Sequence, residues 1–209
     1  MNLYRIKEIF YSLQGEGFHT GCAAVFIRFS GCNLWSGSED DRVSAQCDFC
    51  DTDFTGMDGN HGGEYGAGQL AETALAFWPN SKRPFVVCTG GEPLLQMNDQ
   101  LIAALHSKGC VIAVETNGTV SAPPDIDWLT VSPKVGTTLR QTSGSELKLV
   151  YPQNGLDISQ YESFAFEHFF LQPVDSAKYP NAVMETVKYC LANPKWSLSL
   201  QTHKLAGIK

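Results

Sequence analysis

The chain has 209 residues, which is the length of one typical domain. Its 43% hydrophobic and 18% charged residues exclude a disordered or fibrous protein, and its net charge of −7 disfavours a non-specific nucleic-acid binder. No apolar run approaches the roughly 18 residues of a membrane helix. Arg5, Lys7 and Glu8 stand where a signal peptide would be apolar, so the cytoplasm is the expected compartment.

Strands and helices are predicted to alternate along the chain. Apolar runs predict strands at 23–29, 85–89, 110–116, 128–132, 147–151, 168–171 and 196–201, and helical periodicity predicts helices at 69–78, 99–108 and 181–192. This alternation is typical of a parallel sheet covered by helices. A closed eight-fold barrel usually needs about 250 residues, so the expected fold is α/β, a partial (incomplete) β/α barrel in one domain spanning 1–209.

Residues 30–68 interrupt this pattern with a long segment rich in Gly, Asp and Ser. A loop of that length inside a compact domain is usually functional or disordered. The segment contains Cys32, Cys47 and Cys50 in a C-x14-C-x2-C spacing directly after the first predicted strand. An odd total of seven cysteines in a reducing compartment indicates metal binding or catalysis rather than disulfides.

The spacing of this cysteine triad leaves three interpretations open. Three thiolates can hold a four-iron cluster and leave one iron free for another ligand. A structural zinc ion would need a fourth ligand, such as His61 or a distant residue. The third interpretation is three unligated core cysteines, which is the state we expect for the remaining ones, Cys22, Cys88, Cys110 and Cys190.

Polar segments also follow the predicted strands at their carboxyl ends. They are TGGEP at 89–93, ETNG at 115–118, SPK at 132–134, QP at 172–173 and QTHK at 201–204. Each segment could be an ordinary turn when taken alone. Parallel strands bring all their carboxyl ends to one face, where a β/α barrel builds its active site. The sequence therefore predicts one site formed by these segments and the cysteine triad.

These residues resemble the radical S-adenosylmethionine superfamily and, within it, the 7-carboxy-7-deazaguanine synthases. The resemblance rests on LQGEG at 13–17, the RFSGCNLW and CDFCDTDF segments, CTGGEP, ETNG, VSPK and QTHK, and it covers nearly the whole chain. The usual superfamily spacing is C-x3-C-x2-C, from which this chain departs by an eleven-residue insertion. The resemblance implies a partial barrel of the radical S-adenosylmethionine type whose cluster-binding loop, 30–68, is enlarged.

The resemblance also implies a reaction and its cofactors. The reaction is the ring contraction of 6-carboxy-5,6,7,8-tetrahydropterin to 7-carboxy-7-deazaguanine, a lyase step towards queuosine and other 7-deazapurines. The implied cofactors are a [4Fe–4S] cluster held by the triad, S-adenosyl-L-methionine and an assisting Mg²⁺. The reduced cluster would generate the radical on the cofactor, so no side chain is expected to be catalytic, and the protein would orient the substrate and exclude water.

By resemblance, the strand-end segments bind S-adenosylmethionine. The residues implied are Gly90, Gly91, Glu92, Glu115, Asn117, Ser132, Pro133, Lys134, Gln172, Pro173, Val174 and Asp175. The glycines lack a Cβ, which lets backbone approach a cofactor closely, and Glu92 would face the methionyl amine. Ordinary turns, a first helical turn at Glu92 and a solvated Lys134 remain the structural alternatives.

The substrate residues implied by the resemblance lie before and within the first predicted strand and at the end of the second one. They are Leu13, Gln14, Gly15, Glu16, Arg28 and Thr89. Arg28 lies on a strand that should be buried and therefore needs an anionic partner, either the pterin carboxylate or a structural Asp or Glu. A carboxylate at Glu16 and an amide at Gln14 suit the guanidine-like edge of a pterin.

Two further expectations concern Mg²⁺ and the tail. The resemblance points to the Thr52 hydroxyl as the Mg²⁺ ligand, while the alternative is that Asp51 or Thr52 caps a short helix. His203 and Lys204 would close the site or only order the tail. Lys209 is expected to place its α-carboxylate on the pterin edge, with its side chain reaching outward.

The expected partners are the small pterin substrate, an electron donor such as flavodoxin and a second copy of the chain in a homodimer, with no nucleic acid and no membrane. Two other functions remain open. One is a different radical enzyme, such as a glycyl-radical activase. The match of LQGEG and Arg28 to the substrate side of the synthases disfavours it. The other is a zinc-stabilised binding module without catalysis.

Overall fold

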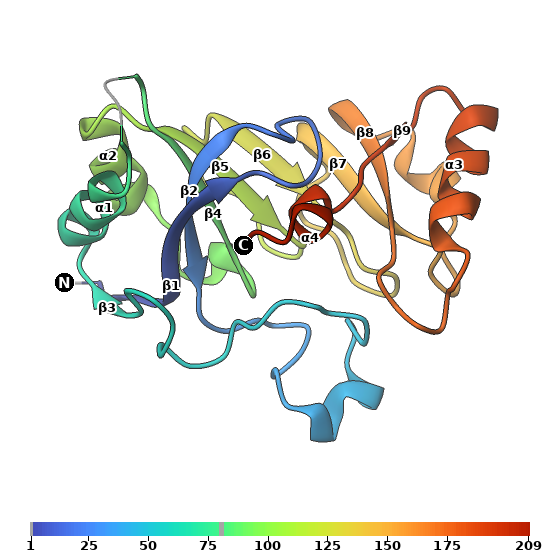
Figure 1. Ribbon diagram of the computed structural model, residues 1–209, viewed down its shortest axis with the longest axis horizontal. Coiled ribbons are helices and arrows are strands. Elements are labelled where there is room, and N and C mark those ends of the chain that lie inside the picture. Colours follow the sequence, from blue (N-terminus) through green and yellow to red (C-terminus); the bar gives the residue numbers. More distant parts are fainter. Residues whose placement is uncertain (1, 80–81) are drawn as a thin grey trace.

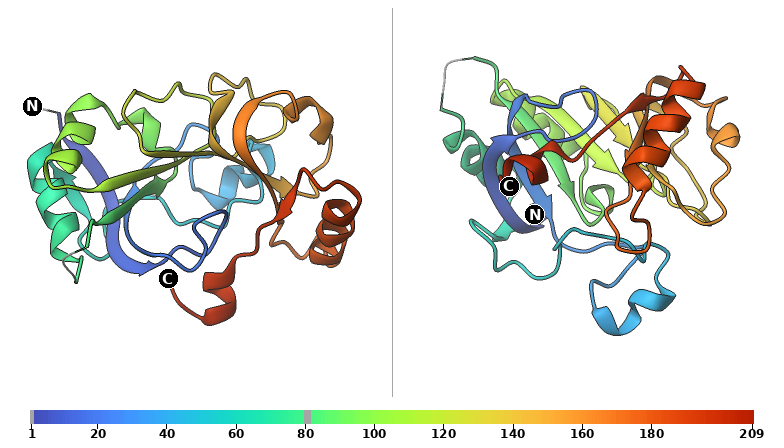
Figure 2. Two further views of the ribbon diagram at one scale, coloured as in Figure 1. Left: turned by 90° about the horizontal axis from the view of Figure 1, so that it is seen from above. Right: turned by 45° about the vertical axis from the view of Figure 1, so that its right-hand side comes forward.

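A computed structural model describes residues 2–79 and 82–209, and its centre is one mostly parallel sheet (Figure 1). Within these residues the sheet has nine strands in the order β3-β1-β2-β4-β5-β6-β7-β8-β9. The strands from β2 to β9 pair in parallel, whereas β1 and β3 are antiparallel to their neighbours. The sheet is curved but open, since β3 and β9 form its two edges (Figure 2).

All seven predicted strands are confirmed. They are β2 (Ala23–Phe29), β4 (Phe85–Gly90), β5 (Val111–Thr116), β6 (Trp128–Val131), β7 (Ser143–Tyr151), β8 (Ala165–Pro173) and β9 (Ser197–Leu198). The last strand has two residues where six were expected. β7 and β8 begin earlier than predicted, because the residues that precede the predicted apolar runs, from Ser143 and Ala165 onwards, already pair with each other in the sheet.

Two strands were not predicted. The first, β1 (Tyr4–Leu13), pairs antiparallel with β2, and its register shifts between Ile6 and Glu8. Adjacent charges at Lys7 and Glu8 break the apolar alternation, which is why the sequence pattern did not indicate this strand. The second, β3 (Gly63–Tyr65), has three residues and lies inside the segment 30–68.

The three predicted helices are α1 (Ala67–Ala76), α2 (Asp99–Ser107) and α3 (Ala182–Ala192). The side chain of Asn98 accepts a hydrogen bond from the Leu101 amide and caps α2, and Gly109 follows the helix with a φ of +76°. α1 and α2 lie side by side near β1, and α3 covers β8 and β9 (Figure 1). A fourth short helix, α4 (Thr202–Ala206), was not predicted.

The two faces of β2 have different environments. Val25, Ile27 and Phe29 are fully buried in the large core beneath the helices. Phe26 belongs to a smaller cluster on the opposite face, where its ring stacks on that of Phe10 with centroids 5.0 Å apart. Arg28 shares this second face, as the alternation predicted. The strand therefore anchors the core with one face and presents Arg28 with the other.

The segment 30–68 extends from the end of β2 to the start of α1 as an extended lobe (Figure 1). Its regular structure is β3 and a 3-10 helix at Glu39–Ser44, which is capped by the Ser38 side chain. No helix in the part of the chain that the structure describes is both long enough and apolar enough to cross a membrane.

Candidate active site

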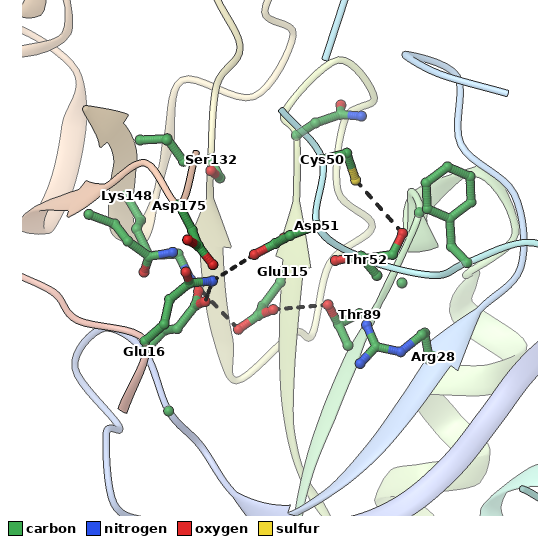
Figure 3. A pocket seen from close by; sticks show the side chains of 18 of the residues that line it. Glu16, Arg28, Cys50, Asp51, Thr52, Thr89, Glu115, Ser132, Lys148 and Asp175 are labelled. Atoms are coloured by element: carbon green, nitrogen blue, oxygen red, sulfur yellow. Dashed lines mark hydrogen bonds and ion pairs between the residues drawn. The ribbon is translucent and has the colours of Figure 1, made fainter. Parts of the chain in front are cut away.

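A cavity of about 350 Å³ lies on the face of the sheet that carries Arg28 (Figure 3). Its wall is formed by β1, β2, the ends of β4 to β8, the segment 30–68 and α4. Predicted site residues that line it are Leu13, Gln14, Gly15, Glu16, Arg28, Cys32, Cys47, Cys50, Thr52, Thr89, Gly90, Gly91, Glu115, Asn117, Ser132, Lys134, Gln172, Pro173, Val174, Asp175 and Lys209. The expected convergence of strand ends on one site is thus observed.

The three cysteines of the triad reach this cavity from two segments. Cys32 follows the end of β2, where its Sγ accepts a hydrogen bond from the Leu34 amide at 3.4 Å. Cys47 and Cys50 lie in the loop after the 3-10 helix, and the Cys47 thiol lowers the pKa of Cys50 to about 6. Burial raises the pKa of Cys32. The loop therefore returns two thiols to the one at the strand end.

The donor set fits a multi-iron cluster better than a single ion. Within residues 2–79 and 82–209, no group of three or more His, Cys, Asp or Glu side chains is arranged to hold one metal ion. A [4Fe–4S] cluster gives each cysteine its own iron, so three thiolates stand farther apart around it than around zinc. Cys32, Cys47 and Cys50 share the cavity wall, and their soft sulfur atoms suit iron.

Gly90 and Gly91 bring the end of β4 close to the cysteine strand. A Cβ on Gly90 would lie 2.3 Å from the Phe29 carbonyl oxygen, and its φ of +133° is unfavourable for other residues. A Cβ on Gly91 would lie 2.1 Å from the Gly31 oxygen and 2.9 Å from Cys32 Cβ. The close approach that these glycines permit is therefore to the backbone that carries Cys32.

Glu92 does not line the cavity, although the resemblance placed it beside the methionyl amine. It is fully buried and caps a 3-10 helix at Pro93–Leu95 by accepting the Leu94 amide at 2.9 Å. It also accepts the Thr116 hydroxyl at 2.8 Å and the Asn117 amide at 2.7 Å. This geometry is closer to the structural alternative, in which Glu92 belongs to the start of a helix. In addition, the bonds from Thr116 and Asn117 connect Glu92 to the end of β5. Pro133 is likewise buried outside the cavity wall.

Arg28 has a protein carboxylate as its partner. Its Nε donates to Oε1 of Glu8, on the neighbouring β1, at 3.0 Å, and its guanidinium lies 5.7 Å from the Phe10 ring centroid. Burial alone would raise the pKa of Glu8, but hydrogen bonds from Lys209 and Arg28 outweigh burial and lower it. Among the described residues nothing else bonds the guanidinium, so its terminal nitrogens remain free on the cavity side.

Glu115, on β5, is the centre of a polar wall two strands away from Arg28, with Thr89 of β4 between them (Figure 3). Its Oε1 accepts Gln14 Nε2 at 3.0 Å, and its Oε2 accepts the Thr89 hydroxyl at 2.9 Å. Lys148 Nζ lies 3.9 Å from the same Oε1 and donates to Oε2 of Glu16 at 2.5 Å. Three residues expected to bind substrate, Gln14, Glu16 and Thr89, are therefore connected with Glu115 in one network of hydrogen bonds and ion pairs.

The residues expected to bind cofactor at the other strand ends are held by local bonds. Lys134 Nζ donates to the Ser132 hydroxyl at 2.9 Å. Asn117 donates from Nδ2 to Asn33 Oδ1 at 3.0 Å. Gln172 Oε1 accepts the Ser199 hydroxyl at 3.1 Å. The residues expected to bind cofactor, Ser132, Lys134, Asn117 and Gln172, still border the cavity.

The segment after Cys50 has no helix for Asp51 or Thr52 to cap, so that alternative is wrong. Asp51 Oδ2 accepts Lys204 Nζ at 2.6 Å and Gln201 Nε2 at 2.9 Å. Burial alone would raise the pKa of Asp51, yet these two hydrogen bonds lower it. The Thr52 side chain remains part of the cavity wall beside Asp51 (Figure 3).

The tail closes over the cavity, but Lys209 is turned opposite to the expectation. Its ammonium reaches inward to Oε2 of Glu8 and lies 5.0 Å from the Phe10 ring centroid. Its main-chain oxygen accepts the Ser12 hydroxyl at 2.6 Å. The buried carboxylate of Glu8 attracts the ammonium, and this attraction is why the side chain does not point outward. His203 packs so closely on Gly15 that a Cβ there would clash with its ring.

Residues of the wall that the sequence did not indicate include Glu8, Phe10 and Lys148. Glu8 and Phe10 were missed with β1, the strand that carries them. Lys148 is a charge within the predicted apolar strand 147–151, which is the same signal that singled out Arg28. Applied to that strand as well, this criterion identifies Lys148 too.

Comparisons with known proteins agree over the full length of the chain. It is 55% identical over 213 residues to the 7-carboxy-7-deazaguanine synthase of Nitratidesulfovibrio vulgaris, covering 98% of this chain and 99% of that protein. It is 54% identical to the synthase of Bradyrhizobium diazoefficiens, with 99% of each covered. No family model matches. A crystal structure of QueE from Escherichia coli superposes with a TM-score of 0.69 and 25% identity, covering 95% of this chain and 93% of that one.

Proposed function

The chain belongs to the 7-carboxy-7-deazaguanine synthase family, and on this premise we propose that it converts 6-carboxy-5,6,7,8-tetrahydropterin to 7-carboxy-7-deazaguanine as a radical S-adenosylmethionine lyase. The observation that carries the proposal is the cavity itself. It joins the three cysteines, the strand-end segments and Arg28 in one wall. We assign the open, curved sheet to the partial barrel of this superfamily on the same basis.

The triad would hold the cluster, and the cofactor would lie along the carboxyl ends of β4 to β8. When bound, the cluster and S-adenosylmethionine would supply the radical chemistry needed for hydrogen abstraction. Ser132, Lys134 and Asn117 offer hydroxyl, ammonium and amide groups for a carboxylate and ribose hydroxyls. Glu92 would act from behind this wall, because it fixes the backbone of Asn117 rather than touching the cofactor.

The substrate would lie between Arg28 and the Glu115 wall. The free terminal nitrogens of Arg28 match the two oxygens of a carboxylate, so they would bind the carboxyl group of the pterin. Gln14, Glu16 and Glu115 form the acceptor-rich polar wall, which suits the amino group and ring N–H of a pterin. The stacked Phe10 and Phe26 form an apolar floor that excludes water from the ring.

Mg²⁺, the redox partner and the assembly complete the proposal. The Thr52 hydroxyl would contribute one oxygen ligand, while substrate oxygens and water fill the rest of a Mg²⁺ shell. A protein electron donor such as flavodoxin would reduce the cluster, and two copies of the chain would associate as a homodimer in the cytoplasm.

Anaerobic turnover tests the proposal. Purified brown protein is incubated with the tetrahydropterin acid, S-adenosylmethionine and a reductant, and the deazaguanine acid is detected by mass spectrometry. Product is expected from the wild type and none from Cys47→Ala. Cofactor cleavage without product would indicate a different radical enzyme. A colourless protein that contains zinc would indicate a non-catalytic binding module.

A further inference from the structure

Lys148 is a buried ammonium in the wall of the cavity (Figure 3). It lies on β7, and its side chain is only 7% exposed. Its Nζ donates to Glu16 Oε2 at 2.5 Å and lies 3.9 Å from Glu115 Oε1. Burying an ammonium is costly unless it is paired and hydrogen-bonded. The two cavity carboxylates therefore offset the cost of burying Lys148.

Three carboxylates surround this one ammonium. Glu16 and Glu115 border the cavity, whereas Glu146 lies behind it and accepts the Phe18 amide at 3.0 Å. Burial alone would lower the pKa of Lys148, but these carboxylates outweigh burial and raise it. Burial alone would raise the pKa of Glu16, but Lys148 outweighs burial and lowers it. Both groups therefore stay charged at neutral pH.

Two other titratable groups face the same carboxylates. Gln201 Nε2 donates to both Asp51 and Glu16. The negative charge of Asp51 disfavours ionisation of Glu16. His19 borders a small hollow together with Glu16, Glu115 and Glu146. Burial lowers the pKa of His19, so it contributes no positive charge at neutral pH. Among the described residues that contact Glu16 and Glu115, Lys148 is thus the cation that keeps these carboxyl groups ionised.

The wall consequently offers acceptors to a ligand. Gln14 Nε2 and the Thr89 hydroxyl donate to Glu115, and Gln201 Nε2 donates to Glu16. Each carboxylate oxygen keeps a second lone pair beyond these bonds. The matching ligand edge carries N–H donors side by side, as in the amino group and ring N–H of a pterin.

We infer that Lys148 is a positioning residue that sets the ligand specificity of this wall, because it holds Glu16 and Glu115 as paired acceptors. The cavity then selects a heterocycle that presents adjacent N–H donors and rejects one that presents a carbonyl at the same place. The inference rests on the proposed function for the identity of the heterocycle. In this role Lys148 acts through the two carboxylates that it contacts.

Calorimetric binding of two stable probes to the cluster-loaded protein tests the inference. They are 6-carboxypterin and 6-carboxylumazine, in which a carbonyl oxygen replaces the amino group. The wild type is expected to prefer the pterin by at least about tenfold, since a mismatched buried acceptor costs about 1.4 kcal/mol or more. This preference should stay constant between pH 6 and pH 8.

Lys148→Met removes the charge and keeps the length of the side chain. Glu16 should then take up a proton near neutral pH and donate it to a carbonyl, so the preference should fall to about threefold or less. Affinity for the pterin should recover as the pH rises and the carboxyl ionises. Lys148→Arg should retain the preference. The matched control is Lys108→Met, which removes an exposed Lys–Glu pair with Glu72 and should change nothing.

An unchanged preference in Lys148→Met would overturn the inference, and so would equal weakening of both probes, which indicates a structural role. If Lys148→Met does not fold, Glu16→Gln decides, because the same fall in preference is expected with Lys148 in place. Wild-type protein that binds neither probe and makes no product would refute the proposed function. Normal turnover together with an unchanged Lys148→Met preference would refute this inference alone.

Discussion

Arg28 and Glu8 face each other across the antiparallel pair of β1 and β2, and Nε of the arginine lies 3.0 Å from Oε1 of the glutamate. The pair uses the side of the guanidinium and leaves its terminal fork to the cavity. Glu8 therefore fixes the orientation of the plane in which Arg28 can accept a carboxylate. Lys209 contacts the other oxygen of Glu8, which ties the tail to the same element.

Arg28→Lys is expected to weaken binding of the carboxypterin by roughly tenfold or more, because the ammonium keeps the charge but loses the two parallel hydrogen bonds. The cluster spectrum and the basal cleavage of S-adenosylmethionine should persist, since the Arg28 guanidinium bonds to Glu8 and, among the described residues, to none of the three cysteines. The measurement is calorimetric binding of 6-carboxypterin beside the visible spectrum. Normal affinity in Arg28→Ala would mean that another group holds the carboxylate.

The Glu8 carboxylate predicts an acid-dependent contribution to stability. Its pKa in the folded chain lies below that of the unfolded chain, so the unfolded state binds more protons in acid and the contribution is lost as the pH falls through the lowered value. At pH 7 we expect Glu8→Gln to unfold about 1–3 kcal/mol more easily than the wild type. The difference should shrink steadily below about pH 4.5, as measured by urea unfolding. A difference independent of pH would contradict the ion pair.

The parallel part of the fold could be predicted from the sequence because its central strands β2, β4 and β5 are mostly buried on both faces. The runs at 23–29 and 85–89 are apolar except for Arg28 and Thr89 and end at polar segments, which is the pattern of a central parallel strand. β1 could not be recognised in the same way, since one of its faces carries Lys7 and Glu8. α4 is five residues long, and its position depends on contacts with Gly15 and Asp51 that no local pattern encodes.

The site was predictable to the extent that its residues stand at strand ends. The triad and the TGGEP and SPK segments meet in one cavity because parallel strands end on one face. Side-chain direction was less accessible. Glu92 turns back to cap its own helix, and Lys209 turns inward to Glu8, in each case because buried partners outside the local sequence decide.

Replacing Cys32, Cys47 or Cys50 by alanine should remove the brown chromophore and all turnover, because a cluster that loses one of three thiolates is not retained. Iron content and visible absorbance of anaerobically purified protein give the measurement. Cys22→Ala is the matched control, since Cys22 is exposed and outside the cavity wall. Cys110→Ala should lower stability at most. A fully active Cys47→Ala protein would refute the triad as the cluster site.

Glu92→Ala should destabilise the chain by about 2–4 kcal/mol, because it leaves the buried amides of Leu94 and Asn117 without their acceptor. Chemical unfolding gives the measurement, and affinity for S-adenosylmethionine should fall with it through the displaced Asn117. Glu72→Ala, on the surface, serves as the control and should cost less than about 1 kcal/mol. A stable Glu92→Ala protein that has lost cofactor affinity would instead place Glu92 in direct contact with the cofactor.

Lys204 joins two segments of the cavity wall, since its Nζ lies 2.6 Å from Oδ2 of Asp51 and 2.6 Å from Oδ2 of Asp175. Partly exposed pairs of this kind contribute about 0–1 kcal/mol each, so Lys204→Ala should leave the unfolding midpoint nearly unchanged. The segments around Asp51 and Asp175 should nevertheless open up to about fivefold more often, because the bridge is their shared tie. Hydrogen exchange of these segments is the measurement, and high salt should produce a similar rise in the wild type.

Lys108→Ala is the control for loss of a surface lysine. Exchange that is unchanged at both segments in Lys204→Ala would show that other contacts, such as those of Gln201 and Thr202, are enough to hold α4 over the cavity.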